Sequence, residues 1–144
     1  MVEQKDKKSN SINKQAFGLI IGLCVEFILG MTTNIFVSFP EHLSEKQNWE
    51  FAKNQIPIIL HLIIGILLFL GSISLLVQAL RLNAKQWIIL GGIGAVVLLG
   101  TVITGSLFVG SQTDNYSFMM AIGFIVSLFV YIWGIYKKYP VKAK

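Results

Sequence analysis

The sequence predicts an all-α membrane protein built as a bundle of four transmembrane helices. Hydrophobic residues make up 54% of its 144 residues and charged residues only 13%, a balance too apolar for an ordinary soluble domain. Crossing the hydrocarbon core of a bilayer takes about 20 mostly apolar residues in a helix. Runs of that kind occur at residues 16–38, 57–80, 87–109 and 117–136. Together they define one transmembrane domain over residues 16–136.

The lysines and arginines indicate how these helices are oriented. Ten of the twelve lie before the first run, between the second and third, or after the fourth, whereas Lys46 and Lys53 lie between the first and second. Cytoplasmic loops carry such an excess. We therefore expect a multi-pass protein of the cell membrane, with both termini in the cytoplasm and loops 39–56 and 110–116 outside. The net charge of +5 reflects this topology, and no base-stacking aromatic residues accompany the lysines to indicate nucleic-acid binding.

The segments outside the runs differ in their expected structure. Residues 1–15 are polar and lysine-rich, which predicts a disordered basic tail, and residues 137–144 form a second basic tail. Within the 39–56 loop, Ser44-Glu45-Lys46-Gln47 fits a capping box, and apolar residues then recur at helical spacing. We therefore expect a short interfacial helix, which lies on the outer surface of the membrane.

Small and polar residues recur every four positions along the first run, at Gly18, Gly22, Glu26, Gly30, Asn34 and Ser38. Residues at that spacing lie on one face of a helix, and small ones let a neighbouring helix approach closely. We therefore expect the first helix to pack this face against protein.

Glu26 lies near the middle of its run, where an ionised carboxylate that faces lipid costs roughly 3 kcal/mol or more. It must therefore be protonated, contact a polar partner, or face a water-filled cavity. No lysine or arginine lies within any run. The expected partners are hydroxyl groups at similar depth, those of Ser72, Thr101 and Ser127.

His61 enters the membrane about one turn below the outer surface, because the second helix runs inward, and Asn34 reaches the same depth from the first helix. His61 is either a neutral imidazole hydrogen-bonded to Asn34 or a hydroxyl, or a group that binds a ligand or carries a proton. We expect Glu26, Asn34 and His61 to form a ligand or proton site in a polar pocket that opens outward. Its expected lining is Ser72, Thr101, Thr104, Ser106, Ser117, Met120 and Ser127.

The sequence offers little support for catalysis or a bound cofactor. Hydrolase nucleophile motifs, phosphate-binding loops and paired catalytic carboxylates are absent, so the sequence favours a protein that is not an enzyme. No metal site and no cofactor are predicted. Haem of the b type is an alternative, because His61 is the one histidine inside a run and Met120 is a second axial candidate at matching depth.

Several short motifs resemble a group of four-helix bacterial integral membrane proteins of unassigned activity. The resemblance covers most of the chain after residue 25, and it rests on Gly30-Met31, Asn34 through Pro40, His61 with Gly65, Ala79 to Arg81, Phe108, and Ser117 through Phe124. It implies that Asn34 and His61 belong to one functional unit, and it implies no particular activity.

These observations leave several functions open. The first is binding or sensing of a small amphipathic ligand in the outward-facing pocket, with the protein acting alone or as an accessory subunit. The second is a proton-linked transporter of small molecules that works as an oligomer. The third is the haem protein, and the fourth a structural subunit of a membrane complex. In each case the expected partners are the lipid bilayer and either further copies of the chain or a larger complex.

Overall fold

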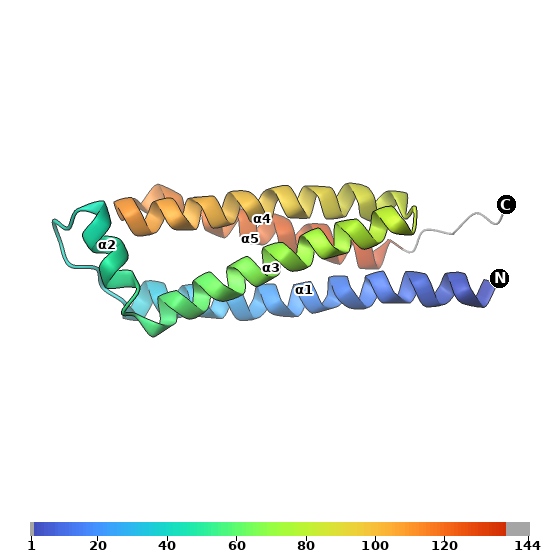
Figure 1. Ribbon diagram of the computed structural model, residues 1–144, viewed down its shortest axis with the longest axis horizontal. Helices are drawn as coiled ribbons and strands as arrows, with labels where there is room; N and C mark the ends of the chain where they lie inside the picture. The colour runs from blue at the N-terminus through green and yellow to red at the C-terminus, as the bar shows by residue number, and fades with distance from the viewer. Residues whose placement is uncertain (1, 138–144) are drawn as a thin grey trace.

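The structure, a computed structural model, describes the backbone of residues 2–137 and the side chains of residues 10–137. Within this part the fold is all-helical (Figure 1), with helices α1 (Val2–Phe36), α2 (Glu45–Ala52), α3 (Ile56–Arg81), α4 (Lys85–Ser111) and α5 (Asp114–Tyr136). All but α2 are long and apolar enough to cross a membrane. The predicted all-α fold with four helices long and apolar enough to span a membrane is confirmed, and the length and composition of these helices indicate a multi-pass membrane protein.

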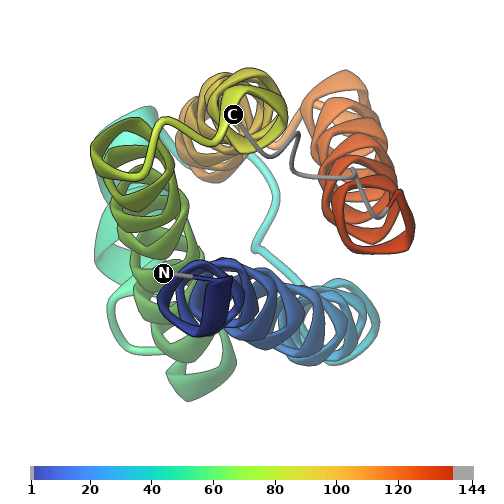
Figure 2. The ribbon, with the colours of Figure 1, turned by 90° about the vertical axis from the view of Figure 1, so that its right-hand side faces the viewer.

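The four long helices surround a common axis (Figure 2), with α1 in contact with α3 and α5, and α4 in contact with the same two helices. Neighbours run antiparallel, so the start of α1 and the end of α5 lie at one end of the bundle and α2 lies at the other (Figure 1). We refer to these two halves as the terminal half and the α2 half. Large apolar side chains on all four helices are exposed, as lipid contact requires.

The terminal half is tightly packed. Leu75 and Ala79 of α3 and Tyr131 of α5 are fully buried there. The Tyr131 hydroxyl lies against Gly94 of α4, where any side chain would occupy its place. Glycine at this position lets α4 and α5 approach closely, which is the usual way in which helices pack in a membrane.

The two ends of the chain were expected to be tails. The structure differs at the first, because α1 covers nearly all of segment 1–15. Ile12 and Ala16 are buried, at 2% and 0% exposure, and Gln15 Nε2 donates a 3.2 Å hydrogen bond to a backbone carbonyl of α3. The expectation of disorder rested on composition alone and overlooked that two apolar residues four apart share one helix face. Except for its first residue, the expected tail at 137–144 lies outside the described residues.

The short helix expected in the first long loop is present as α2. The Ser44 N–H donates a 2.9 Å hydrogen bond to Gln47 Oε1, which is half of a capping box. Asn48 is buried, and its Nδ2 donates to the Gly110 carbonyl at 2.9 Å. A Cβ on Gly110 would come within 3.0 Å of the Glu45 side chain, so the glycine lets α2 lie directly on the end of α4. The position of α2 on the membrane surface stays a prediction.

Candidate functional site

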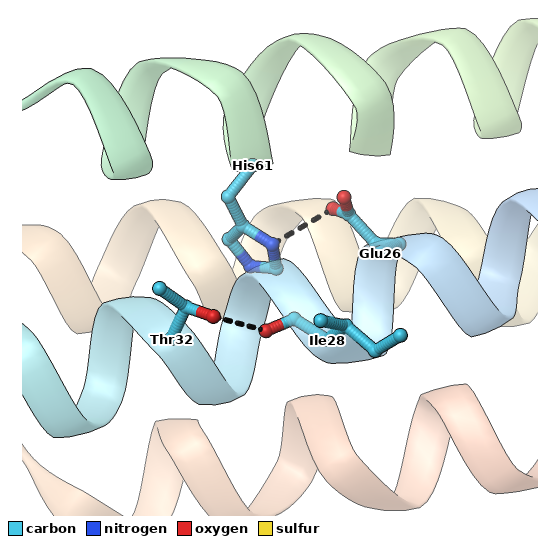
Figure 3. A network of polar contacts seen from close by, with 4 residues as sticks. All are labelled: Glu26, Ile28, Thr32 and His61. Carbon is cyan, nitrogen blue, oxygen red and sulfur yellow. Dashed lines mark hydrogen bonds and ion pairs between the residues drawn. The ribbon is translucent and has the colours of Figure 1, made fainter.

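A carboxylate and an imidazole meet inside the bundle. Glu26 Oε1 of α1 lies 3.0 Å from His61 Nδ1 of α3 (Figure 3), with the two side chains 13% and 31% exposed. The contact is at ion-pair distance, but its angles do not make a hydrogen bond, and Glu26 Oε2 is buried without a hydrogen-bond partner in the described part of the chain. The pair can hold one proton, either on the imidazole or on the carboxyl group.

Two glycines allow this contact. A Cβ on Gly30 of α1 would lie 3.1 Å from His61 Cε1, and a Cβ on Gly65 of α3 would lie 3.0 Å from Glu26 Oε1. Each titratable side chain therefore lies over a glycine of the facing helix. Within each helix the glycine comes four residues after the titratable residue, so these two residues lie on one face of that helix. The arrangement is reciprocal because α1 and α3 run antiparallel.

The pair lines a cavity of about 670 Å³ in the α2 half of the bundle. All five helices contribute to its lining, which is mostly apolar. Leu23, Leu68 and Leu98 are buried core residues at its inner end and form what we call the floor. Loop 37–44 and α2 close the other end and form what we call the roof.

The seam between α1 and α5 is closed by two aromatic rings. Phe27 and Phe124 stack with their ring centroids 4.9 Å apart, and both line the cavity. Stacked rings at this distance contribute stability beyond the area they bury, about 0.5–1.5 kcal/mol. The cavity is therefore bounded by a defined contact on this side.

The structure brings most of the sequence-predicted site residues to one cavity. Its lining includes Glu26, Asn34, His61, Thr101, Ser106, Ser117 and Met120. Asn34 and His61 thus line the same cavity, without a hydrogen bond between their side chains, and their membership of one functional unit stays a prediction.

Three expected lining residues lie elsewhere. Ser72 is fully buried one turn beyond the floor, and its hydroxyl donates to the Phe69 carbonyl at 2.7 Å. Ser127 is also fully buried, and the Thr104 hydroxyl donates to carbonyls of its own helix. Serine and threonine hydroxyls in helices often bond back to the preceding turn in this way.

The partner of Glu26 also differs from the expected one. Thr101 lines the cavity, but its hydroxyl donates to the Val97 carbonyl at 2.9 Å, and His61 lies beside the carboxylate instead. The depth argument placed Glu26 at mid-membrane and His61 near the surface. The signal that could have joined them is the glycine four residues after each.

Sequence reasoning also missed polar residues of the roof and wall. Asn48 of α2 and Thr33 of α1 both line the cavity, and their Oδ1 and Oγ1 atoms are buried without a hydrogen-bond partner among the described residues. Asn48 and Ala52, four residues apart, are the buried residues of α2. A helical-face analysis of this short segment would have marked Asn48 as inward-facing.

The site has limited capacity for a metal or cofactor. Within residues 10–137, no group of three or more histidine, cysteine, aspartate or glutamate side chains could hold a metal ion. His61 and Met120, the axial candidates for haem, do line the same cavity. With Nδ1 of His61 beside Glu26, Nε2 is the nitrogen left to coordinate iron.

Comparisons with other proteins add no assignment. The resemblance to four-helix bacterial membrane proteins stays a prediction from the motifs. When the chain is compared with family models, curated proteins and solved structures, none of them matches it.

Proposed function

We propose that this protein binds a small amphipathic molecule in the cavity of the α2 half. The observation that carries the proposal is a mostly apolar cavity of about 670 Å³ that contains the Glu26–His61 carboxylate–imidazole pair. Ligand sites in proteins commonly have volumes of about 300–1,000 Å³, with mainly apolar walls and a few polar groups that orient the ligand. The apolar walls would hold the body of the molecule, and Glu26 and His61 would hold its polar group.

The charge pattern supports an outward-facing site. With both termini in the cytoplasm, α2 and loop 37–44 lie outside, and the ligand enters from the outer solution or the outer leaflet. In this proposal the protein acts as a sensor or as an accessory subunit. Such a role involves contact with further copies of the chain or with a larger membrane complex.

A cavity-filling substitution tests the proposal. Ser106 lines the cavity, whereas the next residue, Leu107, is 45% exposed on the outside of α4. Ser106→Phe should weaken binding of an alkyl probe such as octylamine by about tenfold or more, equivalent to about 1.4 kcal/mol. Leu107→Phe is the matched control and should bind like the unchanged protein.

Tryptophan fluorescence provides the measurement. Trp49 lines the cavity, whereas Trp87 and Trp133 do not, so a ligand in the cavity changes the emission of one of the three tryptophans. Titration with octylamine would be carried out on the protein in lipid nanodiscs. If Ser106→Phe bound the probe as tightly as Leu107→Phe, the proposed function would be wrong.

A second candidate is proton-linked transport, and the Glu26–His61 contact favours it. A pair that holds one proton inside an apolar bundle can exchange that proton for a substrate. In proteoliposomes with an imposed pH gradient, the transporter predicts probe movement that Glu26→Gln abolishes without loss of folding. If the probe bound to the protein but was not moved by the gradient, only the first proposal, ligand binding, would be supported. If Glu26→Gln and Ser106→Phe changed neither binding nor movement, a structural subunit would be favoured.

A further inference from the structure

The charged groups around the cavity have one predominant sign. Glu26, Glu41 and Asp114 all line it, and its described lining contains neither lysine nor arginine. The cationic candidates are His61, beside Glu26, and His42, which lies 3.9 Å from Glu41 in the exposed roof. A cavity lined in this way favours a positively charged ligand over an anion.

The atoms left without hydrogen-bond partners point to the same class of ligand. Glu26 Oε2 is buried and unpartnered near the floor, and Asn48 Oδ1 is buried and unpartnered in the roof. The orientation of the Asn48 amide follows from its contact, because its Nδ2 faces the Gly110 carbonyl, which can only accept. Asn48 is 4% exposed, so solvent reaches it poorly. An amide oxygen and an ionised carboxylate oxygen both accept hydrogen bonds, so a ligand that contacts both must donate to them.

The two acceptors lie at opposite ends of the cavity. Glu26 is ten residues before the end of α1 at Phe36, which is about 15 Å below the roof at the rise of an α-helix. The walls between them are apolar, and they include Phe27, Ile58, Leu62, Val102 and Met120. One ammonium group cannot reach both ends. An elongated ligand with a donor at each end can.

We propose that the ligand is a linear organic diammonium ion, with one ammonium group at Glu26 and the other beneath Asn48. This inference rests on the proposed function and specifies the class of ligand. The inner ammonium group donates to Glu26 Oε2, the buried carboxylate oxygen without a hydrogen-bond partner. The outer group donates to Asn48 Oδ1, near the carboxylates of Glu41 and Asp114. The methylene chain lies against the apolar walls.

An eight-carbon chain matches this spacing. Extended 1,8-diaminooctane has its nitrogens roughly 11 Å apart at ordinary bond lengths. A hydrogen bond of about 2.8 Å at each end brings the span close to the length of α1 between Glu26 and the roof. Octylamine, 1-octanol and octanoate have the same chain length and differ in their end groups. They separate the contributions of the two ammonium groups from that of the chain.

The experiment compares these four probes by Trp49 fluorescence on the unchanged protein, Glu26→Gln and Glu41→Gln. We expect 1,8-diaminooctane to bind about tenfold more tightly than octylamine. Octylamine should in turn bind more tightly than 1-octanol and octanoate. Glu26→Gln should weaken both amines by about tenfold or more and weaken 1-octanol much less. Glu41→Gln alters an exposed roof residue and should weaken the diamine alone, by about threefold.

Asn48→Ala provides a stricter test of the roof. The ratio of octylamine to diamine dissociation constants should fall towards one, because octylamine makes no contact with Asn48. This ratio is independent of any general loss of stability. Equal affinities for octylamine and 1-octanol would overturn the inference while leaving the proposed function intact. If no probe bound, or if Ser106→Phe changed the affinity of none, the proposed function itself would fail.

Discussion

His61 of α3 lies directly over Gly30 of α1, so close that a Cβ on the glycine would come within 3.1 Å of the imidazole. Glu26 lies over Gly65 in the same way, with its carboxylate 3.0 Å from the position of the missing Cβ. Each of the two helices thus places one titratable side chain over a glycine of the other. The contacts of Glu26 and His61 with these glycines therefore set the distance between α1 and α3 at this level.

Alanine at either glycine should therefore destabilise the protein. Gly30→Ala and Gly65→Ala each place a methyl group 3.0–3.1 Å from a side chain of the facing helix, which must then shift, and overpacking of this kind costs about 1–3 kcal/mol. The free energy of unfolding would be measured by reversible denaturation in detergent. Gly92→Ala and Gly100→Ala are the controls, because nothing lies within 4 Å of their added Cβ atoms. Alanine at the controls should be neutral or stabilising by up to about 1 kcal/mol. Equal effects at all four positions would contradict the packing described here.

The contact between Gly94 and Tyr131 predicts a coupled pair of substitutions. Gly94→Ala should destabilise the bundle, because its methyl group meets the Tyr131 hydroxyl. Tyr131→Phe removes that hydroxyl, so the double variant should recover part of the loss. A double-mutant cycle should give a coupling energy of about 0.5 kcal/mol or more, as found for residues in contact. Strict additivity would show that the two side chains do not share this space.

Cysteine labelling would test the orientation in the membrane. After Cys24→Ser, the one native cysteine is gone, and single cysteines can be introduced at exposed positions. We expect Glu41→Cys to react with an impermeant maleimide added to intact cells, and Lys85→Cys to react after permeabilisation alone. The positive-inside rule is the physical basis of this expectation. The reverse labelling pattern would place the cavity on the cytoplasmic side.

The visible absorption spectrum distinguishes binding of a small amphipathic ligand from the alternative that the protein binds haem. We expect the purified protein to show no Soret band, because the unpartnered acceptor oxygens of the site suit a ligand that donates hydrogen bonds. A Soret band that disappeared in both His61→Ala and Met120→Ala would establish haem in the cavity. It would also remove the diammonium proposal.

The helices themselves were predictable, because the length of an apolar run is dictated by the thickness of the bilayer. The expected runs at 57–80, 87–109 and 117–136 fall inside α3, α4 and α5. The first helix was underestimated at its start, where Ile12 is buried in the hydrophobic core despite the lysines around it. Composition averages over a segment, whereas a single buried side chain is enough to dock one turn of helix.

The site was predictable in part. Lipid exclusion was the reason to expect Glu26 and His61 inside the bundle, and the structure has both lining the cavity with Asn34. Their mutual contact was missed because residue counts give depth only along each helix, and a tilted crossing brings different depths together. Ser72 was misplaced because hydroxyl groups that bond to their own helix need no polar cavity.

The burial of Ile12 and Ala16 has a practical consequence for producing this protein. A shortened chain that starts at residue 10 keeps both side chains and the Gln15 hydrogen bond to α3, whereas one that starts at residue 17 loses all three. Affinity tags and fusion partners therefore belong ahead of Asn10. A boundary drawn at the first apolar run would cut through the folded body.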